Sequence, residues 1–336
     1  MLLTAIAAII VFGLLIGVHE AGHLIAAKLN KVEVTEFAIG MGPKLFSFQG
    51  KETLYSLRLI PIGGYCKLTG EDESIDSPVS FSAKKPLQRI SILAAGAIMN
   101  LILSFVALVI LFAPNEKIST TYVENVLENA PAYSQGLKAG DKIVKLNSTN
   151  VNIDSDVSFF LYRNGDKPVD VTVKRGDEKV VLNITPYSEN GDYYIGYKPQ
   201  SVDNNILETL KYSFHFEVFT SKVVILTIAD LFTGTASVKD TSGPVGIVSE
   251  IGKAAHNGFR NVLYLLALIS VNLGLFNLIP LPALDGGRIL FVLIEFIFRR
   301  PVPQKYEAIV HALGFLALLI LMVFVTFNDV FRLIGN

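Results

Sequence analysis

The residues His19-Glu20-Ala21-Gly22-His23 lie inside an apolar run from Leu2 to Leu29. On a helix, residues four apart share a face, so both imidazoles can reach one Zn²⁺ ion while Glu20 stands ready to take a proton from water. Ionisable side chains are costly in hydrocarbon and are usually retained there for function. The motif favours an intramembrane zinc protease; the alternatives are a satisfied polar cluster between helices and a metal-transport path.

The composition is that of a protein with several membrane spans. Of the 336 residues, 51% are hydrophobic, and the net charge of −1 argues against nucleic acid or another polyanion as a partner. Cys66 is the only cysteine, which excludes an intrachain disulfide and a thiolate zinc cluster. The first 29 residues lack a basic leading region, so we interpret them as a retained helix rather than a signal peptide.

Charge and hydropathy predict a membrane topology. Lysines and arginines are enriched between the first two apolar segments and recur between the last two, and such basic loops are typically cytoplasmic. Both termini are therefore expected on the extracytoplasmic side, with His19 in the cytoplasmic half of its span. Charges interrupt residues 204–232, which favours interfacial amphipathic helices there. The expected spans are Leu2 to Leu29, Leu87 to Ala113, Val262 to Phe298 (interrupted) and Glu307 to Leu333.

The predicted fold is a polytopic α-helical membrane protein with about four transmembrane helices. A membrane-associated β-hairpin on the cytoplasmic side and one inserted extracytoplasmic PDZ-like β/α domain complete it. The expected divisions are a first membrane half (1–113), the PDZ-like domain (114–200), an interfacial amphipathic segment (201–260) and a second membrane half (261–336).

A hairpin is indicated in the first cytoplasmic loop. Apolar residues alternate on both sides of a turn at residues 49–52, and Gly40 and Gly42 permit bends or close backbone approach beside it. We expect this hairpin to dip toward the membrane and to offer an edge to an extended substrate, with Gly40 and Gly42 in the substrate-binding region. An ordinary cytosolic hairpin is the alternative.

Residues from about Ile118 to Tyr197 are polar and contain short β-branched runs typical of a small, mostly β soluble domain. The segment from Ala130 to Ile143 is similar to the binding loop of bacterial PDZ domains. PDZ domains add a peptide as a strand and capture its C-terminal carboxylate on backbone N–H groups. We therefore expect Gly136 and Leu137 to contact peptide C-termini, with a purely structural role as the alternative.

The block from Asn277 to Gly287 breaks the third apolar segment. Prolines and glycines remove helix hydrogen bonds, and irregular backbone at membrane depth is tolerated only beside protein or a water-filled cavity. Asp285 in this break is the candidate third metal ligand, since a catalytic zinc takes three protein ligands and leaves a position for water. Asn272 and Asn277 are candidates for orienting a substrate carbonyl, or for bridging helices.

These motifs together resemble bacterial site-2-type intramembrane zinc metalloproteases of the RseP and RasP kind, within peptidase family M50. Ala97 departs from a proline frequent in the family, and one PDZ-like domain stands where several relatives have two. The matching stretches are His19 to His23, Gly40 to Gly42, Pro61 to Lys67, Ala95 to Asn100, Ser242 to Ile247 and Asn277 to Gly287.

The resemblance implies that His19, His23 and Asp285 hold one Zn²⁺ ion and that Glu20 is the general base. It also implies a bacterial inner-membrane enzyme of regulated intramembrane proteolysis, acting on pre-trimmed single-span membrane proteins such as anti-sigma factors, and on remnant signal peptides. The rival hypothesis is a catalytically silent membrane scaffold that binds peptides with its PDZ-like domain, but it gives no role to a glutamate that is not a ligand. A metal transporter would need a path of intramembrane polar groups, whereas the sequence indicates one compact site.

Overall fold

The computed structural model describes residues 1–71, 75–235, 242–300 and 302–335. Two compact units are distinguished: Met1–Leu108 together with Ser221–Asn336, and Val109–Thr220. The elements of the chain up to the second long helix are α1 (Leu2–Leu29), β1 (Val34–Gln49), β2 (Leu54–Leu68) and α2 (Pro86–Phe112). The helices near the C-terminus are α5 (Ile206–Thr233), α6 (Pro244–Asn257), α7 (Phe259–Leu278), α8 (Asp285–Phe298) and α9 (Gln304–Gly335).

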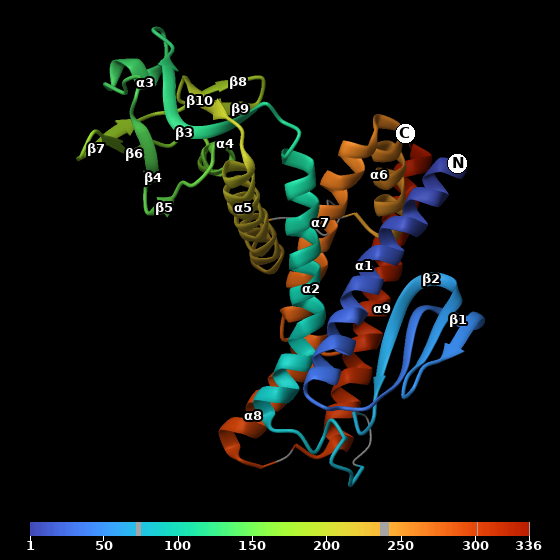
Figure 1. The fold of residues 1–336 in the computed structure, drawn as a ribbon. Coiled ribbons are helices and arrows are strands. Elements are labelled where there is room, and N and C mark those ends of the chain that lie inside the picture. The colour runs from blue at the N-terminus through green and yellow to red at the C-terminus, as the bar shows by residue number, and fades with distance from the viewer. Residues whose placement is uncertain (72–74, 236–241, 301, 336) are drawn as a thin grey trace. The chain divides into compact units, whose positions relative to one another are not determined.

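Four helices in the described part of the chain are long and apolar enough to cross a membrane. They agree with the expected spans, except that the interrupted third segment is two helices, α7 and α8, separated by residues 279–284. Helix α5 is not among these four, as its charged residues led us to expect. Figure 1 shows both termini of the chain at the same end of α1 and α9. The candidate spans are Leu2–Leu29, Pro86–Phe112, Phe259–Leu278 and Lys305–Phe331.

Small residues bring α1, α2 and α7 close together. A Cβ at Gly22 of α1 would overlap the Ala95 carbonyl of α2, so the two backbones touch there. On the other face of α2, a Cβ at Gly274 of α7 would lie 3.0 Å from the Ala97 oxygen. Small residues permit such close packing between membrane helices. Helix α2 is thereby held between α1 and α7.

The predicted hairpin is present as β1 and β2, which turn between Gln49 and Leu54. Both strands bend, and Phe37 is paired with both Tyr55 and Cys66. Residues 34–39 therefore lie between residues 54–57 and residues 64–68, while residues 44–49 pair with residues 54–58. At the bend, Gly40 has φ +86° and a Cβ there would lie 2.7 Å from the Ile60 oxygen, so only glycine fits. The segment 64–68 is an outer margin of this folded hairpin and contacts α1.

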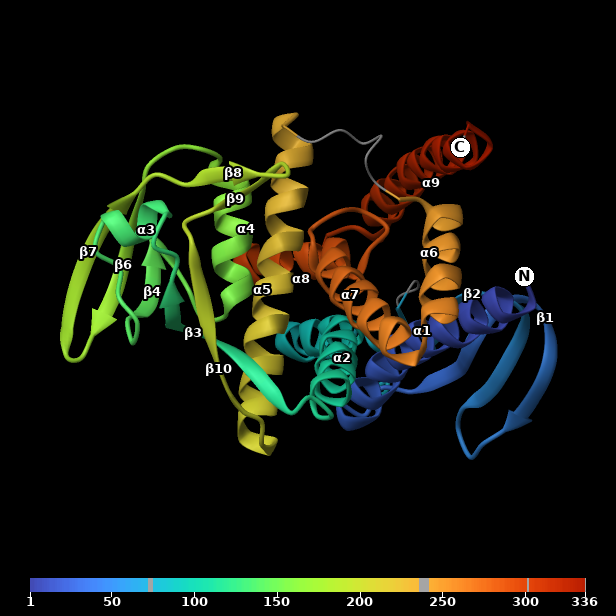
Figure 2. The same cartoon turned by 90° about the horizontal axis from the view of Figure 1, so that it is seen from above.

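Helix α6 contacts both α1 and α9 and lies between them in the view of Figure 2. Its N-terminus is capped from α9, because the buried Asp329 carboxylate accepts the backbone N–H groups of Gly243 (3.1 Å) and Gly246 (2.8 Å). At its other end, a Cβ at Gly252 would lie 2.6 Å from Cγ2 of Thr4 in α1. The motif from Ser242 to Ile247 is thus the capped start of α6. Residues 236–241, inside the segment 201–260 expected to be interfacial, lie outside the described residues.

The second unit is built on an antiparallel sheet in the order β10-β3-β4-β6-β7. Burial by itself would raise the pKa of Asp141, but hydrogen bonds from the Arg175 guanidinium and the Lys138 N–H outweigh it and lower that pKa. The same guanidinium donates to the carbonyl of Gly136 (2.8 Å), which anchors the loop before β4. The elements are β3 (Lys117–Val126), α3 (Pro131–Ser134), β4 (Lys142–Leu146), β5 (Thr149–Asn150), α4 (Asp154–Asn164), β6 (Val169–Arg175), β7 (Glu178–Ile184), β8 (Tyr187–Glu189), β9 (Asp192–Tyr194) and β10 (Tyr197–Asp203).

Candidate metal centre and active site

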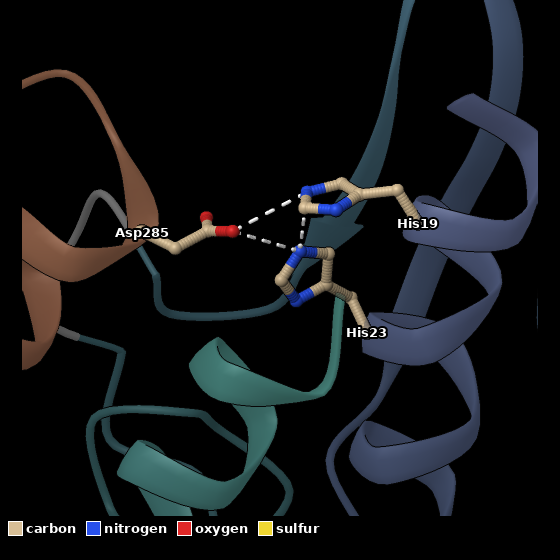
Figure 3. A group of neighbouring side chains, drawn as sticks. All are labelled: His19, His23 and Asp285. Carbon is tan, nitrogen blue, oxygen red and sulfur yellow. Dashed lines mark hydrogen bonds and ion pairs between the residues drawn. The ribbon is translucent and has the colours of Figure 1, made fainter. Parts of the chain in front are cut away.

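His19, His23 and Asp285 converge on one point (Figure 3). Helix α1 supplies both histidines from consecutive turns, and Asp285 is the first residue of α8, directly after the break that follows α7. The prolines at 280 and 282 end α7 before this point, because proline cannot continue a helix ladder. The chain can therefore turn and bring a carboxylate from a segment more than 260 residues away in sequence to the imidazoles.

The donor atoms form a nearly equilateral triangle. The Asp285 Oδ2 atom is 3.3 Å from Nε2 of His19 and 3.4 Å from Nε2 of His23, and the two imidazole nitrogens are 3.3 Å apart. A tetrahedral zinc ion with bonds of about 2.0–2.1 Å needs neighbouring donor atoms about 3.3–3.4 Å apart. The set of two nitrogens and one oxygen, with one position left for water, fits a catalytic zinc.

The hydrogen bond on the far side of His23 fixes which nitrogen faces this point. Its Nδ1–H donates to the buried Ile92 carbonyl (2.9 Å), so in the neutral ring Nε2 presents a lone pair to the other two donor atoms. Oδ2 of Asp285 is buried and makes no hydrogen bond of good geometry with the described residues. Lone pairs that face one another repel, and a cation between them removes the repulsion.

His19 is oriented from α2. Its Nδ1 lies 3.3 Å from the side-chain amide of Asn100, a fully buried residue whose backbone carbonyl accepts the hydroxyl of Ser270 (2.7 Å). With the amide turned so that Oδ1 faces the ring, Oδ1 accepts Nδ1–H and Nε2 of His19 keeps its lone pair for the metal. Turning the amide exchanges its two atoms, so Nδ2 then takes the buried position that has no partner among the described residues.

Glu20 follows His19 on α1 and is held by the hairpin. Its carboxylate accepts the backbone N–H of Cys66, and a Cβ on Gly64 would lie 3.1 Å from Cγ of Glu20. The outer segment 64–68 therefore packs directly against the acidic residue of the motif. Glu20 is not one of the three convergent donors, so it remains available for proton transfer.

Gly96 leaves room for the two imidazoles. A Cβ there would overlap Nε2 of His23 and lie 2.7 Å from Cε1 of His19. The position belongs to the motif from Ala95 to Asn100, but sequence reasoning gave it no role at the site. The requirement for glycine comes from the packing of α2 against the motif face of α1.

The other predicted site residues fall into two groups. In α7, Asn272 donates to the Leu268 carbonyl of its own helix (2.8 Å), and Asn277 is half-buried near the C-terminal end. In the second unit, the prediction for Gly136 and Leu137 needs correction. Leu137 is 3% exposed in the domain core, and the N–H groups of Gly136 and Leu137 already donate to Tyr133 and Ala132. Neither residue offers a backbone donor to a peptide, because this loop is closed on itself.

The sequence reasoning also missed Asn100, Ile92 and His311 as parts of the surroundings of the site. Ile92 acts through its backbone carbonyl, which no side-chain pattern reveals. His311 lies in the apolar segment from Glu307 to Leu333, and sequence reasoning gave it no role. In the structure its Nδ1 accepts the backbone N–H of Ala283, two residues before Asp285. A lone polar residue in an apolar span was the available signal.

Comparison with known proteins identifies relatives over almost the whole chain. The model of peptidase family M50 matches residues 7–321. A protein of Clostridium acetobutylicum is 43% identical over 96% of this chain and 96% of its own length, and one of Clostridium perfringens is 38% identical over 96% and 97%. A Staphylococcus aureus protein is 31% identical over 98% of this chain and 99% of its own length. All three are assigned as zinc metalloproteases.

Among solved structures, a PDZ domain of an SdrC-like protein from Listeria monocytogenes is 21% identical to this chain. The alignment covers 24% of this chain and 88% of the PDZ domain, with a TM-score of 0.22.

Proposed function

The chain belongs to peptidase family M50 and is a zinc metalloprotease with several membrane helices, and we propose that it hydrolyses peptide bonds within the membrane-spanning segments of other proteins. The observation that carries this proposal is the triangle of donor atoms contributed by His19, His23 and Asp285. Both histidines lie on a helix long and apolar enough to span a bilayer. A substrate bond must therefore reach membrane depth to be cut.

We assign His19, His23 and Asp285 as the ligands of one Zn²⁺ ion. When bound, this ion polarises the scissile carbonyl and allows water to act as a nucleophile near neutral pH. Glu20, held by the N–H of Cys66, accepts the proton of the attacking water and returns it to the leaving amine. Asn277 is the candidate donor to the developing oxyanion, while Asn272 is committed to a hydrogen bond within α7.

The substrate must be extended at the bond that is cut, because a helix hides its carbonyls in internal hydrogen bonds. We propose that it pairs with the outer hairpin segment 64–68, since this segment contacts Glu20. Gly40 and Gly42 serve this role indirectly: both have positive φ, and they allow the bend that brings segment 64–68 into place.

We further propose that both termini are extracytoplasmic in a bacterial cell membrane and that the site lies in the cytoplasmic half of the bilayer. The support is the enrichment of lysine and arginine in the hairpin loop and after α8.

The substrates proposed are pre-trimmed single-span proteins, including anti-sigma factors and remnant signal peptides. The β-rich unit would act as a PDZ-like filter that engages peptide C-termini and excludes untrimmed proteins. Its contact residues would lie outside the closed loop at Gly136 and Leu137.

The deciding experiment compares wild type with Glu20→Gln and Asp285→Ala, by cleavage of a single-span model substrate in liposomes and by bound zinc. We expect Glu20→Gln to retain zinc and to lose about 100- to 10,000-fold in rate, and Asp285→Ala to lose both zinc and activity. Glu250→Gln is the control, since this exposed residue on α6 forms an ion pair with Lys253 (2.7 Å) in its own helix. Undiminished cleavage by Glu20→Gln would refute the mechanism. A zinc-containing wild type that cuts no substrate would favour a silent scaffold.

The filter is tested by replacing residues 118–197 with a short flexible linker. Untrimmed substrates should then be cut at a rate approaching that of trimmed substrates. If the shortened protein still cuts only trimmed substrates, selection takes place elsewhere.

A further inference from the structure

Helix α9 holds the loop that ends at Asp285. The backbone N–H of Ala283 donates to Nδ1 of His311 across 2.9 Å. Ala283 has φ +73°, a left-handed conformation that is unfavourable for a residue with a side chain. The loop thus adopts an unfavourable backbone angle two residues before the proposed metal ligand, and the imidazole holds the chain at that point.

The same face of α9 touches the loop a second time. Gly314 is three residues after His311, which places both on one side of the helix. A Cβ at Gly314 would overlap the Cβ of Pro282 and lie 2.9 Å from its carbonyl oxygen. The ring of His311 also lies 5.6 Å from the ring of Phe291 on α8. This face of α9 therefore contacts the chain on both sides of Asp285.

Most of α9 has no such support. In its apolar window only 6% of the residues are buried, so protein covers little of the helix surface. A second polar attachment lies near the far end, where Asp329 caps α6. The contact of His311 with Ala283 is a polar attachment of α9 that lies next to the metal centre.

The hydrogen bond at Nδ1 determines which nitrogen of a neutral His311 ring carries the proton. Because Nδ1 accepts a backbone N–H, a neutral ring carries its proton on Nε2, and Nε2 faces Oε1 of Glu307 at 3.9 Å. A backbone N–H that loses its acceptor within the membrane is costly. An apolar side chain at this position would leave the N–H of Ala283 to find another acceptor by moving the loop.

We propose that His311 is a positioning residue that sets the carboxylate of Asp285 for metal binding by holding the backbone of Ala283. The inference rests on the proposed ligand set, in which Oδ2 of Asp285 must stay 3.3–3.4 Å from both imidazole nitrogens. Groups that orient metal ligands from outside the coordination sphere are worth about 10- to 100-fold in metal affinity or activity.

The test compares zinc retention against a competing chelator in the full-length protein with His311→Leu and His311→Asn. Leucine removes the acceptor at similar size, whereas Oδ1 of asparagine stands as many bonds from Cβ as Nδ1 does. We expect His311→Leu to lose about 10- to 100-fold in zinc affinity and to lower kcat more than it raises KM. His311→Asn should keep most of the zinc affinity and most of kcat. The proposal would be overturned if His311→Leu retained zinc as well as wild type does. It would also be overturned if His311→Asn lost as much zinc affinity as His311→Leu.

Gly314→Ala provides a second route to the same loop if the leucine variant does not fold. Its methyl group would displace Pro282, so zinc affinity should fall, while Ala317→Val on an exposed face of α9 should leave it unchanged. Unchanged affinity in Gly314→Ala would count against control of the site by α9. Asp285→Ala distinguishes failure of the proposed ligand set from failure of the proposed role of His311. If Asp285→Ala retains zinc, the ligand set is wrong. If Asp285→Ala loses zinc but His311→Leu keeps it, only the role of His311 is wrong.

Discussion

Cys66 on strand β2 directs its backbone N–H to the carboxylate of Glu20 on helix α1. The only cysteine of the chain therefore acts through its backbone, and its thiol is dispensable for this contact. Burial, together with the negative charges of Glu20 and Glu71, raises the pKa of the thiol to about 12. Such a thiol is a poor nucleophile at neutral pH. The hairpin thus supports the proposed general base without contributing a reactive group.

Cys66→Pro is expected to abolish most of the cleavage, because proline has no N–H to donate to Glu20. Cys66→Ala keeps the donor and should stay within a few-fold of wild type, or about 1 kcal/mol in transition-state free energy. The rates are measured on a model substrate, and zinc content checks that the metal ligands are intact. A strong defect in the alanine variant would mean that the thiol itself matters.

Gly96→Ala is expected to remove zinc binding, because its Cβ would overlap Nε2 of His23 and displace the imidazole from the triangle. Gly13→Ala on α1 is the matched control, since a Cβ at Gly13 meets nothing within 4 Å. Metal analysis of both purified variants checks the prediction. Full zinc occupancy in Gly96→Ala would show that α2 can retreat from α1, contrary to the tight packing at Gly22.

Asn100→Leu should weaken zinc binding by about 10- to 100-fold, because Nδ1 of His19 loses its side-chain hydrogen-bond partner. Asn100→Asp keeps a side-chain oxygen at the same position and should retain much of the affinity, as carboxylates commonly accept from metal-bound histidines. Chelator competition measures both variants. Equal affinities in Leu and Asp variants would show that the amide does not orient His19.

The folded hairpin should resist acid because of Glu36. Burial alone would raise the pKa of this carboxyl, but hydrogen bonds from Arg58 and Ser56 outweigh it and lower the pKa from 4.5 to about 2. A lowered folded-state pKa contributes stability above the unfolded value, and this stability is lost as the pH falls from 4.5 toward 2. Arg58→Met should therefore expose the hairpin amides to exchange at a higher pH than in wild type.

Hydrogen exchange followed by mass spectrometry measures this shift along the acid range. Lys44→Met is the control, because the Lys44 ammonium is 3.5 Å from Glu36 and 41% exposed, so solvent screens its contribution. An identical acid profile in wild type and Arg58→Met would exclude the Glu36–Arg58 pair as the source of acid resistance.

Features that depend on neighbours along the chain follow from the sequence alone. Apolar length predicted the four candidate spanning helices, and the four-residue spacing of His19 and His23 predicted that both imidazoles lie on one face. The alternating residues around Gln49 predicted the hairpin, and the prolines before Asp285 predicted the break. Helical and strand periodicity and proline geometry are local properties, so a single sequence reveals them.

The distant groups that support the site could be identified only in the folded protein. The Ile92 carbonyl, the Asn100 amide, the Cys66 N–H and the His311 ring come from four other segments, and the packing of α2, β2 and α9 brings them to the motif. Local resemblance also misled at Leu137, where a motif expected to bind peptides proved to be closed on the core of its domain. Contacts between segments depend on how helices approach one another, and that distance is set by the summed packing of the fold rather than by any one stretch of sequence.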